Sequence, residues 1–262
     1  MDITEVRADL LAEQDGLDSV VSSLTAEQWG LATPSPRWSV ADQIGHLAYF
    51  DGTAAQAIVD PDGFTAGLSD ALGSISGTPE EADNFSLGAY RAMTPPELLE
   101  AWRANREILA DAAATLANDT RVAWYGPSMG SKSFLTARLM ETWAHGQDIV
   151  DTVGASRAPS DRLKHIAQLG FITRGWSYIN RGLEAPESLV RVELTSPSGA
   201  TWTFGDDAAE QSVTGSAEDF VMVVTQRRHV DATQLTVVGA DARDWLEKAQ
   251  AFAGGPTDGP SA

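Results

Sequence analysis

The fold of this chain is decided in the stretch ARLMETWAHGQDI, residues 137–149. The stretch reads as a helix in which Glu141 and His145 stand four residues apart. At about 3.6 residues per turn, that spacing sets a carboxylate and an imidazole on one helix face, with Asp148 about one turn further on. Such a face can hold a divalent metal of the zinc, iron or nickel kind, because these ions take imidazole and carboxylate ligands at about 2.0–2.2 Å.

A third ligand is needed, and sites with three protein ligands keep positions open for water or substrate. His46 lies far upstream in WSVADQIGHL, residues 38–47, where a capping box starts a helix and leaves His46 about two turns inside it. Taken alone, His46 is better read as a packed histidine that donates to a backbone carbonyl. Together with Glu141 and His145, it completes a predicted metal site.

The residues around Glu141 support this interpretation. An exposed surface carboxylate is the alternative, but Met140 and Trp143 flank Glu141 with apolar bulk, and burial of an unpaired carboxylate is costly. Arg138 lies three residues before Glu141 and shares roughly that side of the helix. We expect Arg138 and Asp148 to act in catalysis, with the arginine pairing Asp148 or meeting a substrate carboxylate, and a surface role for Arg138 is the alternative.

Composition limits the classes of function. The 262 residues are 43% hydrophobic and include 8 Trp, enough for one large domain or two modest ones with cores. A net charge of −19 repels phosphate backbones and anionic lipid, so neither nucleic acid nor a membrane is an expected partner. No apolar run approaches the length of a membrane span, and the first residues lack the pattern of a signal peptide. A cytoplasmic protein is expected.

The chain contains 0 Cys. Disulfides, cysteine nucleophiles and thiolate metal ligands are therefore excluded, and a metal must be held by nitrogen and oxygen. If the chemistry depends on a thiol, that thiol must arrive as a separate small molecule, and the open position of a three-ligand site is where it could bind and ionise.

The first part of the chain has the pattern of a helical bundle. Apolar residues at helical spacing, caps and prolines predict helices over 2–24, 40–59, 94–116, 131–152 and 163–180. The Gly- and Ser-rich segment 63–84 reads as a long loop with at most a short helix, and a loop of this length often serves as a lid. In the turn-rich segment 124–130, Trp124 and Tyr125 are read as core or as pocket lining.

From Pro186 the pattern changes to alternating apolar and polar residues. Strands are predicted at 189–195, 200–205, 211–215 and 235–238, and helices at 216–227 and 240–253. The layout is a helical bundle over 1–182, followed by a small α+β domain over 186–253 and a disordered tail over 254–262.

These features together resemble the DinB-like four-helix bundles of up-down-down-up type, and within them the branch of mycothiol-dependent maleylpyruvate isomerases of actinobacteria. The resemblance rests on residues 38–47, on ETWAHGQD at 141–148 and on the domain order. The C-terminal segment resembles the domain of that branch that is distantly similar to sterol carrier proteins, with matches at 216–220 and 224–228. The resemblance implies an α+β fold that covers nearly the whole chain.

The resemblance also implies a site and a chemistry. In that family a divalent metal, usually zinc in the isomerase branch, is held by a histidine of the first motif and by the Glu and His of an E-x-x-x-H motif, which are His46, Glu141 and His145 here. Asp148 is the acid that often follows in such motifs, and we expect it to be a nearby group that supports the ligands. The implied reaction is isomerisation or S-transfer on a small organic substrate with mycothiol or a similar thiol. The thiol adds to an activated double bond and, in an isomerase, leaves again after rotation.

The sequence allows alternatives for the metal, for the role of a basic cluster and for the class of function. Two imidazoles and one carboxylate suit zinc, nickel, iron(II) or manganese. Arg227 and Arg228, in a basic cluster of the second domain, could hold a carboxylate or thiol-cofactor oxygens in a cleft between domains, or could simply complement a helix C-terminus. The alternatives to the thiol-dependent enzyme are a non-catalytic metal or small-ligand binding protein and a metal-assisted hydrolase with Asp148 or Glu141 as base. A monomer or homodimer is expected.

Overall fold

The computed structural model describes residues 2–74, 78–125, 128–257, 259 and 260. The chain forms two compact units, 1–156 and 157–262. The predicted boundary near 182–186 therefore shifts, because the helical segment predicted at 163–180 belongs to the second unit. None of the helices in the described part of the chain has the length and apolar character needed to cross a membrane.

The elements of the first unit are, in chain order, α1 (Ile3–Val21), α2 (Ala26–Trp29), α3 (Val40–Val59), α4 (Pro61–Ser74), α5 (Pro79–Arg91), α6 (Pro95–Ala114), β1 (Arg121–Val122), β2 (Met129–Gly130) and α7 (Ser131–Val153). The elements of the second unit are α8 (Leu163–Ile172), α9 (Arg174–Ile179), β3 (Val190–Thr195), β4 (Thr201–Phe204), β5 (Gln211–Ser216), α10 (Ala217–Val224), the 3-10 turn η1 (Val230–Ala232), β6 (Thr236–Val238) and α11 (Ala240–Lys248).

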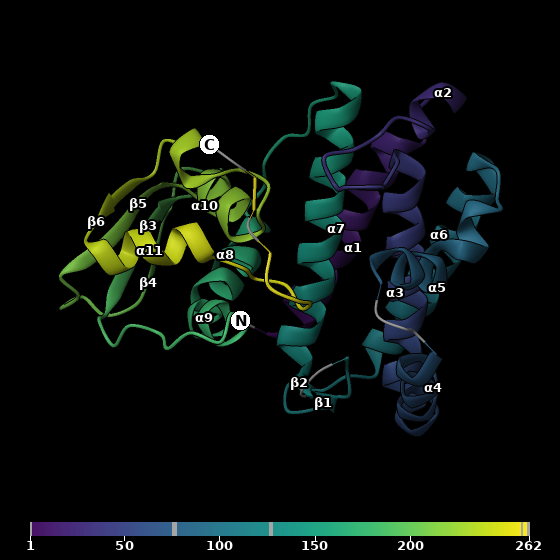
Figure 1. Ribbon diagram of the computed structural model, residues 1–262, viewed down its shortest axis with the longest axis horizontal. Coiled ribbons are helices and arrows are strands. Elements are labelled where there is room, and N and C mark those ends of the chain that lie inside the picture. Colours follow the sequence, from purple (N-terminus) through teal and green to yellow (C-terminus); the bar gives the residue numbers. More distant parts are fainter. Residues whose placement is uncertain (1, 75–77, 126–127, 258, 261–262) are drawn as a thin grey trace. The chain divides into compact units, whose positions relative to one another are not determined.

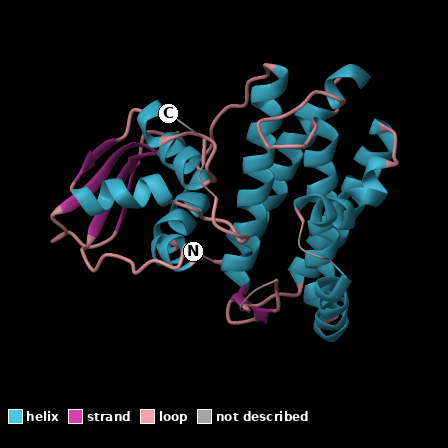
Figure 2. Ribbon diagram, in the orientation of Figure 1, coloured by secondary structure: helices cyan, strands magenta, loops and turns pink. Residues whose placement is uncertain are grey.

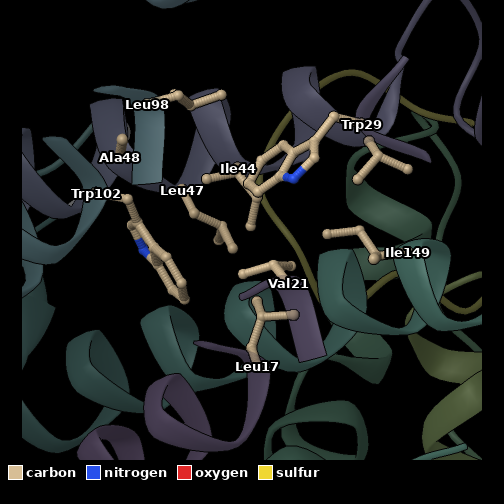
Figure 3. Packing of buried hydrophobic residues seen from close by; sticks show 10 residues of the cluster. Leu17, Val21, Trp29, Ile44, Leu47, Ala48, Leu98, Trp102 and Ile149 are labelled. Carbon is tan, nitrogen blue, oxygen red and sulfur yellow. The ribbon is translucent and has the colours of Figure 1, made fainter. Parts of the chain in front are cut away.

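The first unit is a bundle in which α3 packs against α6 and α7, and α1 packs against α6 and α7 (Figure 1). Each of these four helices contributes to one apolar cluster, which Figure 3 shows from close by. Its members are Leu17, Val21, Trp29, Val40, Ile44, Leu47, Ala48, Leu98, Trp102 and Ile149. Full burial of one large aliphatic side chain is worth about 1.5–3 kcal/mol, so this cluster holds the four helices together.

Local signals position the two helices that matter most for the site. α3 begins at the predicted capping box, where the Ser39 hydroxyl accepts from the backbone N–H of Asp42 and the Asp42 carboxylate accepts from the backbone N–H of Ser39. It ends at Val59, because Pro61 opens the next helix and lacks an N–H group. α7 ends at Gly154, whose φ of 66° is left-handed and closes the helix without strain.

The predicted loop at 63–84 is wrong. Helices α4 and α5 occupy most of it, and residues 75–77 of that segment lie outside the described residues. Thr78 and Glu81 form a capping box with Pro79 in the first turn of α5, and the side chains of Phe64 and Leu87 are buried. Caps and two buried anchors outweigh the weak helix propensity of glycine and serine in this segment.

The second unit contains a four-stranded sheet of order β4-β3-β5-β6, which Figure 2 shows beside the helices of that unit. β3 pairs antiparallel with β4, as the predicted hairpin requires, and parallel with β5. The long predicted helix is interrupted at Thr173, whose hydroxyl donates back to the carbonyl of Leu169. α8 approaches α10 closely at Gly170, where an added Cβ would meet Val224 Cγ2 at 2.6 Å.

Contacts within the second unit continue past the predicted domain end at residue 253. The side-chain amide of Gln250 donates to the carbonyl of Gly255 at 3.1 Å, and the side-chain amide of Gln226 donates to the carbonyl of Thr257 at 3.1 Å. Residues 258, 261 and 262 of the predicted disordered tail lie outside the described part of the chain.

Candidate functional site

Helices α3 and α7 carry the predicted metal ligands on facing sides. On α3, Gln43, His46 and Phe50 follow one another at spacings of three and four residues and therefore share a face. On α7, Glu141 and His145 share a face for the same reason. Since α3 packs against α7, residues about a hundred positions apart in the sequence meet.

Both histidines converge on one carboxylate oxygen. His46 Nε2 lies 3.1 Å from Glu141 Oε2, and His145 Nε2 lies 3.0 Å from the same atom. The two imidazole rings are 4.3 Å apart, centroid to centroid. The exposed fractions of the side chains are 14% for His46, 22% for Glu141 and 10% for His145, so the group is enclosed but reachable from solvent.

A chain of hydrogen bonds orients the ring of His145. The side-chain amide of Gln43 donates through Nε2 to the Thr33 hydroxyl at 2.8 Å, and that hydroxyl donates to the carbonyl of Trp38 at 2.9 Å. The amide oxygen of Gln43 therefore faces His145 Nδ1, at 2.5 Å, and accepts its proton. His145 Nε2 is then the ring atom that faces the Glu141 carboxylate and could bind a metal.

The electrostatics of the group follow from burial and from these contacts. Burial lowers the pKa of His46 to about 4, and the neighbouring His145 adds to that shift. Burial alone would raise the pKa of Glu141, but hydrogen bonds with His145 and His46 outweigh it and hold that pKa well below its usual range. A neutral imidazole and an ionised carboxylate are the forms that bind a metal.

The three residues fit a divalent ion. Their ligand atoms all lie within 4.8 Å of one another. Donors bound to one ion at about 2.0–2.2 Å stand about 2.8–3.6 Å apart at bond angles of about 90–110°, a range that includes the two observed N···O distances.

Asp148 lies behind His145. Its Oδ2 atom accepts from the Ser35 hydroxyl at 3.1 Å and is 3.9 Å from His145 Nδ1. The Nδ1 edge of the ring is opposite the Nε2 edge that faces Glu141. Asp148 is 4% exposed and lies on the Nδ1 side of the ring, where a group that supports the histidine is expected, and its role in catalysis stays a prediction.

Arg138 has a partner that the sequence analysis did not identify. Its guanidinium donates to Asp51 Oδ1 through Nη2 at 2.9 Å and through Nε at 3.2 Å. The alternative of a surface role is wrong, because the Arg138 side chain is only 4% exposed. The predicted pairing with Asp148 is also wrong, since ten residues of helix separate the two by about 15 Å.

Two functional neighbours were missed, Gln43 and Asp51. Gln43 could have been found from its position three residues before His46, on the same helix face. Asp51 carries a weaker signal: an acid in an apolar stretch of α3 requires a buried partner. Burial raises the pKa of Asp51, and donors from Arg138, Trp102 and Gln14 oppose that shift.

Aromatic side chains continue from the histidines. Two aromatic rings neighbour the ring of His46. The Trp38 ring lies 5.0 Å from it and the Phe50 ring lies 4.5 Å from it, centroid to centroid. Phe50 in turn contacts Tyr125 at 5.5 Å and Trp124 at 6.2 Å. The segment 124–130 thus reaches the site through its first two residues, while residues 126 and 127 lie outside the described part of the chain.

Arg227 and Arg228 follow α10 in the second unit. The side chain of Arg227 donates through Nη1 to the carbonyl of Thr225 at 2.7 Å, and Arg228 donates through Nη1 to the carbonyl of Arg227 at 2.7 Å. Both contacts satisfy carbonyls just past the end of the helix, where cations are favoured. Their predicted role in holding a cofactor stays a prediction.

Three comparisons relate the chain to known proteins. The family described as "Mycothiol maleylpyruvate isomerase N-terminal domain" matches residues 10–150. Two uncharacterized proteins of Mycobacterium tuberculosis, MT0041 of strain CDC 1551 and Rv0036c of strain H37Rv, are each 44% identical over 252 residues, which cover 96% of this chain and 96% of theirs.

Solved structures share the fold. The crystal structure of the mycothiol-dependent maleylpyruvate isomerase is 18% identical, with a TM-score of 0.58, and the match covers 90% of this chain and 93% of that one. A histidine-to-alanine mutant of the same enzyme matches with 17% identity, the same TM-score of 0.58 and the same coverage. The α+β fold with an N-terminal helical bundle is therefore confirmed.

Proposed function

Because the chain belongs to the family of the mycothiol maleylpyruvate isomerase N-terminal domain, we propose that it is a metal-dependent enzyme that uses mycothiol or a similar low-molecular-weight thiol. The proposed reaction is isomerisation or S-transfer on a small organic substrate. The proposal rests on one observation above all, the convergence of His46 Nε2 and His145 Nε2 on Glu141 Oε2 at 3.1 and 3.0 Å.

His46, Glu141 and His145 would hold the ion, and the donor set suits zinc, with nickel, iron(II) and manganese as alternatives. A bound divalent ion supplies a Lewis acid at which a thiol ionises near neutral pH. The chain itself has 0 Cys, so the thiol must come from outside, in agreement with the thiol named for the family.

The remaining polar residues position these ligands. Gln43 holds the proton of His145 on Nδ1 and keeps Nε2 free to coordinate. Asp148 supports the same ring from the Nδ1 side. The Arg138–Asp51 pair ties α7 to α3 beneath the site, and Arg227 and Arg228 are proposed to bind a carboxylate or thiol-cofactor oxygens.

The first experiment is to measure metal content by elemental mass spectrometry on protein purified without a chelating tag. Wild type is expected to carry about one equivalent, and His46→Ala and Glu141→Ala are expected to lose it. Glu100→Ala, which removes an exposed carboxylate on α6, is the matched control and should keep the metal. A wild type that stays metal-free after loading with zinc, nickel, iron(II) and manganese in turn would refute the proposal.

The second experiment separates the thiol-dependent enzyme from its alternatives. Turnover of an activated alkene is measured with and without mycothiol. Activity that appears only with the thiol supports the proposal. Hydrolysis without any thiol indicates a metal-assisted hydrolase, and ligand-linked stabilisation without turnover indicates a binding protein.

A further inference from the structure

Six aromatic side chains lie beside the candidate metal ligands, and we call them the aromatic cluster: Trp38, Tyr49, Phe50, Phe64, Trp124 and Tyr125. Trp38 is connected to the other five through the His46 ring. Most of its members are only partly buried, and Tyr125 is 36% exposed. Phe64 is the buried anchor, stacked on Trp124 with ring centroids 5.7 Å apart and an interplanar angle of 8°. Large aromatic side chains left partly open next to a polar site indicate a surface for a ligand rather than core.

The cluster is continuous with the proposed reaction centre. The Phe50 ring lies 4.5 Å from the His46 ring, and the Trp38 ring lies 5.7 Å from the His145 ring. The ring of Tyr125 contacts that of Phe50, with centroids 5.5 Å apart. A molecule that reacts at the ligands would therefore rest against ring faces and edges.

The charges beside the cluster do not favour an anionic substrate. Arg138, whose guanidinium carbon lies 5.9 Å from the centroid of Phe50, is bound to Asp51 at 2.9 Å. A carboxylate substrate that bound Arg138 would have to separate this buried ion pair, which costs free energy.

Two further arginines near the site are also engaged with acids. Arg37, which precedes Trp38 in the chain, binds Asp83 at 3.0 Å. Arg91 binds Asp42 at 2.7 Å, one turn before His46 on α3. Each of these cations is therefore already paired with an acid of the protein.

The cluster has one polar edge, where the hydroxyls of Tyr49 and Tyr125 lie 3.4 Å apart. Burial, together with the hydrogen bond to Tyr49, raises the pKa of Tyr125 well above its usual value. The phenol therefore stays protonated at neutral pH and suits a hydrogen bond with a neutral carbonyl group.

We propose that the substrate of this site is an uncharged aromatic electrophile, seated on Phe50, Trp124 and Tyr125, and not a dicarboxylate. This inference rests on the proposed function for its thiol chemistry. In the conjugation of an aryl enone, the thiol sulfur bonds to the β-carbon, the C=C π bond breaks, and the thiol proton ends on the α-carbon. No oxidant or reductant is consumed.

A matched pair of probes tests the charge preference. 4-Phenylbut-3-en-2-one and 4-oxopent-2-enoate share the same methyl enone. The first carries a phenyl group at the position where the second carries a carboxylate. With metal-loaded full-length protein and mycothiol, kcat/KM corrected for the uncatalysed rate is expected to favour the phenyl enone by at least about 10-fold. A preference for the carboxylate enone would overturn the inference.

Variants at Tyr125 test whether the aromatic cluster is the origin of the preference for the phenyl enone. One aromatic contact is worth about 2- to 12-fold, so Tyr125→Ala should raise KM for the phenyl enone by that factor more than KM for the carboxylate enone, which shares only the carbonyl. Tyr125→Phe keeps the ring and should preserve the ratio of the two KM values. Ile108→Ala, at a 55% exposed position on α6, is the control for a general loss of apolar surface. An equal effect of Tyr125→Ala on both probes would contradict the assignment.

A binding measurement separates this inference from the proposed function. 4-Phenylbutan-2-one has no double bond to accept a thiol, so its affinity by calorimetry reports the aromatic cluster alone. If it binds, and Tyr125→Ala weakens that binding, while neither enone is turned over, the inference stands and the proposed function fails. If thiol-dependent turnover occurs but the ketone does not bind, the inference fails and the proposed function stands.

Discussion

The buried pair of Arg138 and Asp51 offers a quantitative test of how the site is held. Asp51 is 0% exposed and accepts from Arg138 through two nitrogen atoms, from Trp102 Nε1 at 3.2 Å and from Gln14 Nε2 at 3.1 Å. Arg138→Met removes the only charged donor and leaves a carboxylate in the core. Breaking a buried pair in this way costs about 3–5 kcal/mol, which is a large share of a typical stability of about 5–15 kcal/mol.

The double variant Asp51→Asn with Arg138→Met tests the physical reason. An asparagine oxygen can still accept from Trp102 and Gln14, and no uncompensated charge remains. We therefore expect the double variant to be more stable than Arg138→Met alone, with a coupling energy of about 2–3 kcal/mol.

The assay is denaturation in urea followed by tryptophan fluorescence. Arg103→Met is the matched control, since Arg103 also pairs with an acid, Asp18, but its side chain is 44% exposed. A pair at the surface is worth about 0.2–1 kcal/mol, so this variant should change stability little. The reasoning is refuted if Arg138→Met costs no more than the control, or if the two site variants are additive.

Further predictions concern the ligand shell, the packing and the pH dependence. Gln43→Leu removes the acceptor of His145 Nδ1 and should weaken metal affinity about 10- to 100-fold in a competition titration with a chelating dye, whereas unchanged affinity would exclude the proposed orientation of the imidazole. Gly170→Ala should destabilise the protein by about 1–3 kcal/mol in thermal unfolding, because the new Cβ would meet Val224 at 2.6 Å, and Val224→Ala in the same chain should restore stability if that clash is the cause. The hydrogen bond with Arg103 lowers the pKa of Asp18 below 3.8, so its stabilisation is present above that pH and is lost as the pH falls through the folded-state pKa. In urea titrations below about pH 5, the free energy of unfolding should therefore depend less on pH for Asp18→Asn than for wild type. Identical pH dependences would count against this role of Asp18.

Local patterns in the sequence predicted the elements that depend on neighbours in the chain. The capping box before α3, the helical spacing of α7 and the turn between β3 and β4 all act within a few residues, and the structure has these elements at nearly the predicted bounds. The segment 63–84 was the main error, because two buried side chains, Phe64 and Leu87, stabilise helices that glycine and serine content argued against.

Contacts between distant segments could not be predicted in the same way. The parallel pairing of β3 with β5 depends on how the intervening chain returns to the sheet, which the alternation of residues does not specify. The partner of Arg138 was assigned to the wrong acid for the same reason, since Asp51 lies 87 positions away in sequence and meets it only where α3 packs on α7.

The sequence by itself determined the residue types of the candidate site, the helix faces that carry His46, Glu141 and His145, and the absence of a cysteine thiol in the chain. The tertiary structure alone decided that both imidazoles meet one carboxylate oxygen, that Gln43 sets the proton on His145, and that the aromatic cluster borders the ligands. The physical reason is that helix periodicity and capping act over one or two turns, whereas the packing of α3 on α7 is set by the apolar cluster of the whole bundle.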